Sequence, residues 1–142
     1  MTIAAILSGK GNEVISIAPT QSVMEAAATL AQRRVGALPV VEGDAVIGIF
    51  SERDVIHALN NGGVEALEAS VASAMTAPAI TVGLHDSVLG ALSLMSRRRI
   101  RHLPVVEGGA LIGFVSIGDL VKYRIDRIEA DAAAMRDYIQ SV

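Results

Sequence analysis

The stretch LPVVEGDAVIGIFSERD, residues 38–54, returns almost unchanged as LPVVEGGALIGFVSIGD at residues 103–119. The offset is 65 residues, and the match continues on both sides without a gap, over residues 14–56 and 79–121. Of these 43 aligned positions 17 are identical, and many of the others exchange one aliphatic residue for another. The chain therefore contains an internal duplication, and its fold is expected to be one small unit used twice.

Each copy of the unit predicts the order β-α-β-β-α. The β-branched segments 14–17 and 79–82 are predicted strands, and Ser22 and Ser87 are predicted N-caps of the helices that follow them. LPVV and the apolar run after the glycine turn form a predicted hairpin, and a second helix follows it. One copy has too small a sheet to bury its helices alone. We therefore predict an α/β (α+β) fold in which two tandem repeats pack as a pseudo-two-fold pair.

The C-terminal segment predicts one long helix. After Asp119 the chain contains no Gly or Pro, and apolar residues recur at alternating steps of four and three. These residues are Val121, Ile125, Ile128, Ala132, Met135 and Ile139. We expect the distal part of this stripe to pack on a partner in a homodimer, and the faces of the repeats to take part in the same interface. The alternative is that the stripe packs onto its own protomer.

The predicted boundaries are 1–61 for the first repeat with its N-terminal segment, 62–78 for a connector, 79–125 for the second repeat and 126–142 for the helix extension.

Composition excludes several classes of function. The net charge of −3 argues against a nucleic-acid binder that works by bulk electrostatics. The absence of cysteine excludes thiol catalysis and Cys-based zinc sites, and the three histidines have no ligand partner at metal spacing. The first residues do not resemble a signal peptide, and every apolar run is too short for a membrane helix. We expect a cytoplasmic protein without metal, catalytic cofactor, nucleic-acid partner or membrane segment.

The repeated Ser-x-x-Asp motif has two compatible interpretations. Ser51 in GIFSERD and Ser116 in GFVSIGD are predicted helix N-caps, with Asp54 and Asp119 in the first turn. A helix N-terminus also favours anions, and a carboxylate one turn into the helix accepts from two vicinal hydroxyls at once. His57 lies on the same helix as Ser51 and Asp54, but steps of three residues do not bring the three side chains into a catalytic triad. The sequence shows no catalytic site.

The duplicated unit, with LPVV followed by G-h-h-S-x-x-D (h, hydrophobic), closely resembles the CBS domain pair (a Bateman module). The resemblance covers roughly residues 1–125, and the flanking segments look like those of small stand-alone bacterial CBS-pair proteins. It implies clefts between the repeats that bind adenosine nucleotides. It also implies that the aspartate of each motif takes the ribose hydroxyls and that the neighbouring serine helps to hold phosphate.

Basic residues distinguish the two implied clefts. Arg101 and His102 stand directly before the second LPVV, where the first repeat has Gly36 and Ala37. An arginine offers a planar fork to phosphate oxygens, so the cleft at Asp54 is the predicted stronger site. Arg97, Arg98 and Arg99 are instead expected to be solvated at a helix C-terminus. The predicted stronger site comprises Ser51, Arg53, Asp54, Pro78, Ile80, Thr81, Arg101 and His102. The predicted weaker site comprises Lys10, Ile15, Gly36, Ala37, Ser116 and Asp119, with Lys10 supplying its only charge for a ligand.

These features together predict a non-enzymatic regulatory module that binds an adenine nucleotide between its two repeats. AMP is the default ligand, with ADP, ATP, NAD(H) and S-adenosylmethionine as alternatives, and an unidentified protein would be regulated. The competing interpretation is a structural dimerisation adaptor without a ligand, in which Ser-x-x-Asp is only a helix cap.

Overall fold

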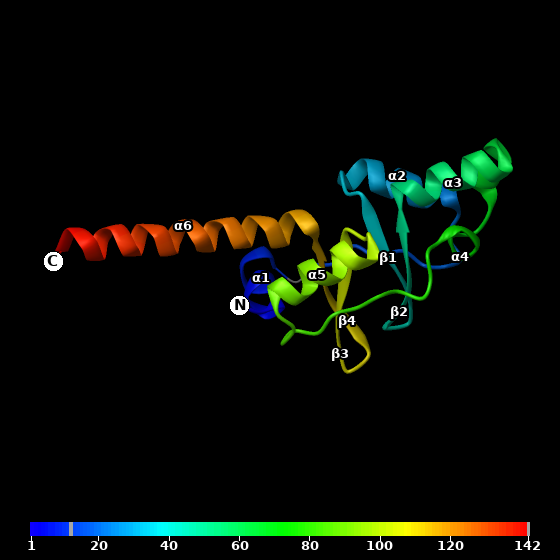
Figure 1. Ribbon diagram of the computed structural model, residues 1–142. Coiled ribbons are helices and arrows are strands. Elements are labelled where there is room, and N and C mark those ends of the chain that lie inside the picture. Colours follow the sequence, from blue (N-terminus) through cyan, green and yellow to red (C-terminus); the bar gives the residue numbers. More distant parts are fainter. Residues whose placement is uncertain (12, 142) are drawn as a thin grey trace.

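The structure is a computed structural model that describes residues 1–11 and 13–141. Two similar halves lie side by side, and a long helix extends away from them (Figure 1). The helices of the first half and its lead-in are α1 (Ile3–Lys10), α2 (Val23–Arg33), α3 (Glu52–Gly62), the 3-10 helix η1 (Val64–Glu68) and α4 (Val71–Ala74). The second half contains α5 (Val88–Arg98) and α6 (Ile117–Ser141). The strands are β1 (Ala37–Glu42), β2 (Ala45–Ser51), β3 (His102–Glu107) and β4 (Ala110–Ser116).

Each half is built on one antiparallel hairpin, and the two hairpins have the same register. Ala37 pairs with Ser51 in the first hairpin, and His102 pairs with Ser116 in the second. Both ladders shift register at the Val-Val pair of LPVV. The turns contain Gly43, Gly108 and Gly109 at positive φ, a conformation that glycine adopts without strain. The predicted duplication and its hairpins are therefore confirmed.

The first strand of each predicted unit is much shorter than expected. Residues 14–17 and 79–82 were predicted to be strands, but each contributes one parallel bridge, Ile17 to Val40 and Val82 to Val105. Ile17 donates its N–H to the Pro39 carbonyl at 3.1 Å and accepts from the Val41 N–H at 2.8 Å. A turn begins two residues after each bridge, so the chain leaves the hairpin before a ladder forms.

The helices begin where the serines predict. Ser22 caps α2, with Glu25 completing a reciprocal capping box, and Ser87 caps α5. Helix α3 begins immediately after Ser51, which has the same reciprocal arrangement with Asp54. These caps fix the starting points of the helices relative to the hairpins.

The chain has two hydrophobic cores, one in each half, and each is completed by the segment that precedes the other repeat. Ile3, Ile6 and Leu7 of α1 come before the first repeat but are buried in the core of the second. Conversely, Val71 of α4 comes before the second repeat and is buried in the core of the first. Strands β2 and β4 contact each other across the middle. The halves are thus joined both by their hairpins and by these exchanged segments.

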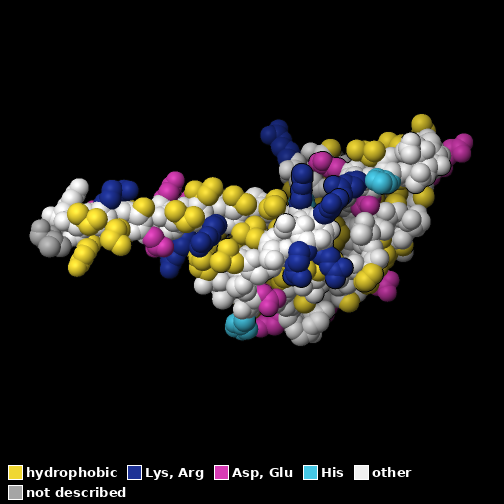
Figure 2. All heavy atoms as spheres, viewed as in Figure 1, with side chains coloured by type: hydrophobic (Ala, Val, Ile, Leu, Met, Phe, Trp, Pro, Cys, Tyr) yellow, Lys and Arg dark blue, Asp and Glu magenta, His cyan; other side chains and the backbone are white. Residues whose placement is uncertain are grey.

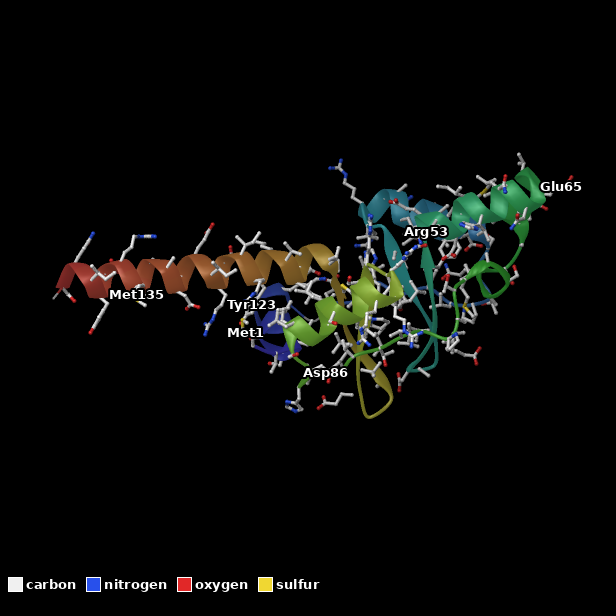
Figure 3. All side chains as sticks on the ribbon, in the orientation of Figure 1. Met1, Arg53, Glu65, Asp86, Tyr123 and Met135 are labelled. Atoms are coloured by element: carbon white, nitrogen blue, oxygen red, sulfur yellow. The ribbon has the colours of Figure 1, made fainter. Side chains whose placement is uncertain are left out.

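The predicted long C-terminal helix is confirmed over residues 117–141; Val142 lies outside the described residues. Leu120, near its start, is fully buried, and Tyr123 packs against the second core close to Met1 (Figure 3). Beyond that point α6 leaves the body of the protein (Figure 1). In residues 1–11 and 13–141, no helix is both long enough and apolar enough to cross a membrane.

Candidate functional site

A cavity of about 620 Å³ lies between the two halves. Helix α3 of the first repeat forms one side, and the junction between α5 and β3 of the second repeat forms the other. The segment that leads into the second repeat supplies an apolar wall. The side chains and backbone that line the cavity are Gly36, Ala37, Ile49, Ser51, Glu52, Arg53, Asp54, Ile56, Thr76, Pro78, Ala79, Ile80, Arg98, Arg99, Ile100, Arg101 and His102.

The acidic end of the cavity is the capping box of α3. Oδ2 of Asp54 accepts from the Ser51 N–H at 2.8 Å, and its Oδ1 accepts from the Thr76 hydroxyl at 3.1 Å. Thr76 is held in place because its backbone exchanges two hydrogen bonds of 2.9 Å with Ile49. A carboxylate has about four acceptor sites. The Ser51 hydroxyl also donates to Oδ2 at 3.2 Å, so Asp54 is a positioned acceptor with capacity left on Oδ1 for a hydroxyl group of a ligand.

The basic end combines residues from both repeats. Arg53 extends from α3 on the side of the second repeat (Figure 3), while Arg98, Arg99 and Arg101 surround the end of α5. Arg99 terminates that helix in the left-handed conformation, with φ of 55°, so the chain turns sharply before β3. Figure 2 shows Lys and Arg side chains gathered on this part of the body.

None of these four guanidinium groups is neutralised by a carboxylate. Within residues 1–11 and 13–141, the one salt bridge joins Lys10 and Asp119, outside the cavity wall. The cavity is lined by four arginines and two carboxylates, those of Glu52 and Asp54, so positive charge is in excess. Unpaired guanidiniums around a cavity favour an anion, which would accept charge-assisted hydrogen bonds from them.

His102 lies where the two repeats meet. Its ring stacks on Phe114, with centroids 5.5 Å apart and ring planes at 14°. Burial lowers the pKa of His102 below its usual value, and the charges of Lys10 and Arg101 act in the same direction, against Asp119 and Glu52. The imidazole is therefore neutral at pH 7 and offers one N–H donor to the cavity.

The structure places most residues of the predicted stronger site on one surface. Seven of them line the cavity; Thr81 is exposed and does not belong to the wall. Gly36 and Ala37, which were expected opposite Asp119, line the cavity of Asp54 instead. Ile15, assigned to the weaker site, packs against the first hydrophobic core. Of that site, Lys10, Ser116 and Asp119 come together in a separate cluster.

Several lining residues were not singled out by the sequence. Arg98 and Arg99 were interpreted as solvated; they are exposed, but both also line the cavity. Thr76 reaches Asp54 from 22 positions away, a contact that no local motif indicates. The sequence signal for these lining arginines was the run Arg97–Arg99 before Arg101. A helix that ends beside a cavity brings its last residues to the cavity wall.

No metal centre is visible in the part of the chain that the structure describes. Nowhere in residues 1–11 and 13–141 do three His, Cys, Asp or Glu side chains gather as a metal site requires.

Comparisons with known proteins identify both repeats. The family model described as "CBS domain" matches residues 11–61 and again residues 71–126. The CBS domain-containing protein CBSX3 of Arabidopsis thaliana, described as mitochondrial, is 33% identical over 98% of this chain and 72% of its own length. The CBS domain-containing protein YhcV of Bacillus subtilis is 31% identical over 85% of this chain and 86% of its own length.

Solved structures agree with this assignment. The CBS-domain protein ATU1752 of Agrobacterium tumefaciens is 38% identical and superimposes with a TM-score of 0.82, covering 87% of this chain and 92% of that one. The CBS domain pair of protein MJ0100, solved in complex with 5-methylthioadenosine and S-adenosyl-L-methionine, is 25% identical with a TM-score of 0.77 over 87% of this chain and 98% of that one. An inosine-5'-monophosphate dehydrogenase of Korarchaeum cryptofilum also matches, but over only 24% of its length.

Proposed function

Because the chain belongs to the CBS domain family and contains two copies of the domain, we propose that it is a regulatory module that binds an adenine nucleotide in the cavity between its repeats. AMP is the ligand we assign by default. The observation that carries this proposal is that one positioned carboxylate and four unpaired arginines share a single cavity. A nucleotide has the complementary arrangement, with ribose hydroxyls at one end and phosphate at the other.

The ribose is assigned to Asp54. Its carboxylate is oriented by Ser51 and Thr76, and Oδ1 retains acceptor capacity for one ribose hydroxyl; a second hydroxyl would replace the hydroxyl of Ser51 or Thr76. The cap and the ligand site are the same structure, since the hydrogen bonds that begin α3 also fix the direction of the carboxylate. Preorganisation of this kind reduces the cost of ordering groups on binding.

The phosphate is assigned to the arginines, with His102 as an additional donor. The excess of positive charge favours anionic ligands over S-adenosylmethionine, whose sulfonium would lie among like charges. ADP, ATP and NAD(H) are compatible with the same surface, and the binding experiment below ranks them. The adenine is assigned to the apolar wall at Pro78, Ala79 and Ile80.

Regulation follows from where the ligand would lie. Asp54 belongs to the first repeat and Arg101 to the second, so a bound nucleotide bridges the two and favours the arrangement in which both contacts are made. A ligand shifts a conformational equilibrium by its difference in affinity for the two states. We propose that an unidentified partner protein detects that shift.

We assign the chain no catalytic activity of its own. The dehydrogenase relative matches over about a quarter of its length, so that likeness is to one part of the enzyme. We also propose that the protein is a homodimer whose interface comprises the exposed stripe of α6 and the faces of the repeats.

The cytoplasmic location inferred from composition stays a prediction. The competing function is a dimerisation adaptor without a ligand.

Isothermal titration calorimetry with AMP tests the proposal, followed by ADP, ATP, NAD(H) and S-adenosylmethionine. Asp54→Ala and Arg101→Ala should each weaken AMP binding by tenfold or more, about the effect of losing one charge-assisted hydrogen bond. Glu25→Ala is the matched control, because it removes the equivalent capping box of α2 away from the cavity. Binding that survives both cavity substitutions would refute the site. Absence of binding by every nucleotide would favour the adaptor.

A further inference from the structure

The two Ser-x-x-Asp motifs occupy equivalent places in the duplicated fold. An offset of 65 residues relates Asp54 to Asp119, whereas an offset of 68 relates the segment 71–75 to the segment 3–7. Val71 and Ile3 donate to the carbonyls of Gln21 and Asp86, which are equivalent positions of the two repeats. Both segments pack against the glycine that precedes the motif. A Cβ atom on Gly48 would lie 2.7 Å from the sulfur of Met75, and one on Gly113 would lie 2.7 Å from Cδ1 of Leu7. Helix α1 thus holds in the second repeat the place that α4 and its following residues hold in the first.

The two aspartates nevertheless have different partners. Asp54 accepts from the neutral hydroxyl of Thr76 at 3.1 Å and faces the cavity. Asp119 accepts from the ammonium of Lys10 at 2.6 Å, and the same ammonium donates to the Phe114 carbonyl at 2.6 Å. By the same correspondence Met75 is the counterpart of Leu7, and the residue that corresponds to Lys10 in the other repeat is Pro78, which offers no donor.

The position of the ammonium, more than the strength of the ion pair, matters for binding. The side chains of Lys10 and Asp119 are 38% and 29% exposed, and a pair this accessible to solvent is only modestly stabilising. However, the Lys10 ammonium contacts Oδ2 of Asp119, which also accepts from the Ser116 N–H, so a ribose would have only Oδ1 available and would meet the ammonium beside it. The buried residues Ile3, Ile6 and Leu7 anchor the helix of Lys10 in the core. A ligand at Asp119 would have to displace the Lys10 side chain, whose backbone is fixed by α1 and whose ammonium is hydrogen-bonded to Asp119 and Phe114.

We propose that Lys10 closes the second cleft by substituting for a ligand at Asp119, so that each chain binds one nucleotide, at Asp54. This rests on the proposed function and reverses the role expected for Lys10 from the sequence, where it was to attract a ligand. The duplicated fold then has one open site, at Asp54, and one site that the chain itself occupies, at Asp119. Lys10 is the residue that makes this difference.

The test is the stoichiometry of AMP binding in calorimetry. The wild-type chain should bind one AMP per chain, and Asp119→Asn should leave that event within about twofold of its original affinity. Lys10→Met, which removes the ammonium but keeps a side chain of similar length, should add a second and weaker binding event that Asp119→Asn then removes. Lys122→Met is the matched control, because it removes the same charge from an exposed position on α6.

The outcomes separate this inference from the proposed function. Two AMP molecules bound per wild-type chain, or a stoichiometry that stays at one in Lys10→Met, would overturn the role of Lys10 while leaving the Asp54 site intact. Absence of binding by wild type and Lys10→Met alike would refute the proposed function, and this inference with it.

Discussion

Gly36 of the first repeat faces His102 of the second: a Cβ atom built on Gly36 would lie 3.6 Å from Cε1 of the imidazole and 3.9 Å from its Nε2. The backbone of Gly36 thus lies directly against the ring, which stacks on Phe114 and lines the cavity. The histidine is therefore half-buried at the point where the repeats meet, and its protonation changes the charge of the proposed binding site.

AMP binding is predicted to take up protons through His102. The pKa of the free histidine is lowered, first by burial and then by Lys10 and Arg101, against the opposite influence of Asp119 and Glu52. A phosphate nearby would favour the imidazolium and raise that pKa. Calorimetry in buffers of different ionisation enthalpy near pH 6 should show greater proton uptake for wild type than for His102→Gln. The phosphate itself titrates near pH 6, so the difference between the two proteins is the informative quantity, and equal uptake would contradict the prediction.

Asp119→Asn is predicted to destabilise the fold at neutral pH but not at acid pH. Burial alone would raise the pKa of Asp119, but the hydrogen bond from Lys10, those from Ser116 and the Lys10 charge outweigh it and lower the pKa below its usual value of 3.8. A group with a lowered pKa contributes stability above its unfolded pKa and loses it as the pH falls through the folded pKa. The amide oxygen of Asn can still accept from the Ser116 N–H, so the loss comes from the charge of the carboxylate, and because the pair with Lys10 is accessible to solvent we expect about 1 kcal/mol or less.

Urea unfolding at pH 7 and again at the lowest pH at which the protein stays folded, well below 3.8, would measure this difference in the free energy of unfolding. Protein concentration should be held constant, because association contributes to apparent stability. Asp126→Asn, at an exposed position on α6, is the control. An equal deficit at both pH values would show that the carboxylate charge at position 119 is not the cause.

Arg98 and Arg97 are adjacent in the sequence but are predicted to differ in their effect on binding. Arg98 lines the cavity, whereas Arg97 does not belong to its wall. Arg98→Gln should weaken AMP binding by about tenfold, the equivalent of 1.4 kcal/mol, and Arg97→Gln by less than twofold. The loss from Arg98→Gln should shrink as salt is raised, since screening weakens the interaction that it removes. Equal effects of both substitutions would indicate general electrostatic attraction instead.

The duplication, the hairpins and the helix caps could be predicted because each depends on short-range patterns. Ser22 and Ser51 form their caps within four residues, and the glycine turns bring together strands that are adjacent in the chain. The first strands were overestimated because β-branched composition does not indicate how soon the following turn ends the pairing. The pattern 14–17 looked like a strand, but only Ile17 pairs.

The site was only partly accessible to sequence reasoning, because its remaining contacts are long-range. The Ser-x-x-Asp motif and Arg101 stand at recognisable points of the repeat. Lys10 either attracts a ligand or neutralises Asp119, and which of the two it does depends on how α1 packs against the second repeat. The two residues are 109 positions apart in the sequence. Likewise, Thr76 reaches Asp54 only because the connector returns to pair with Ile49. Such arrangements follow from tertiary packing, on which the local sequence carries little information.

Removal of residues 127–142 is predicted to convert a dimer into a monomer. The stripe on α6 is exposed in the single chain, at 49% for Ile125, 52% for Ile128 and 64% for Ile139. Burial of each large aliphatic side chain against a partner is worth about 1.5–3 kcal/mol. Leu120, which anchors the helix in the core, remains in the truncated chain. Light scattering should therefore give the mass of a monomer, half that of the dimer, without loss of the folded body.

Ile128→Glu should also shift the protein toward the monomer. Ala130→Glu, on the opposite side of the helix, should not. An unchanged mass for both the truncated chain and Ile128→Glu would exclude α6 as the dimer interface.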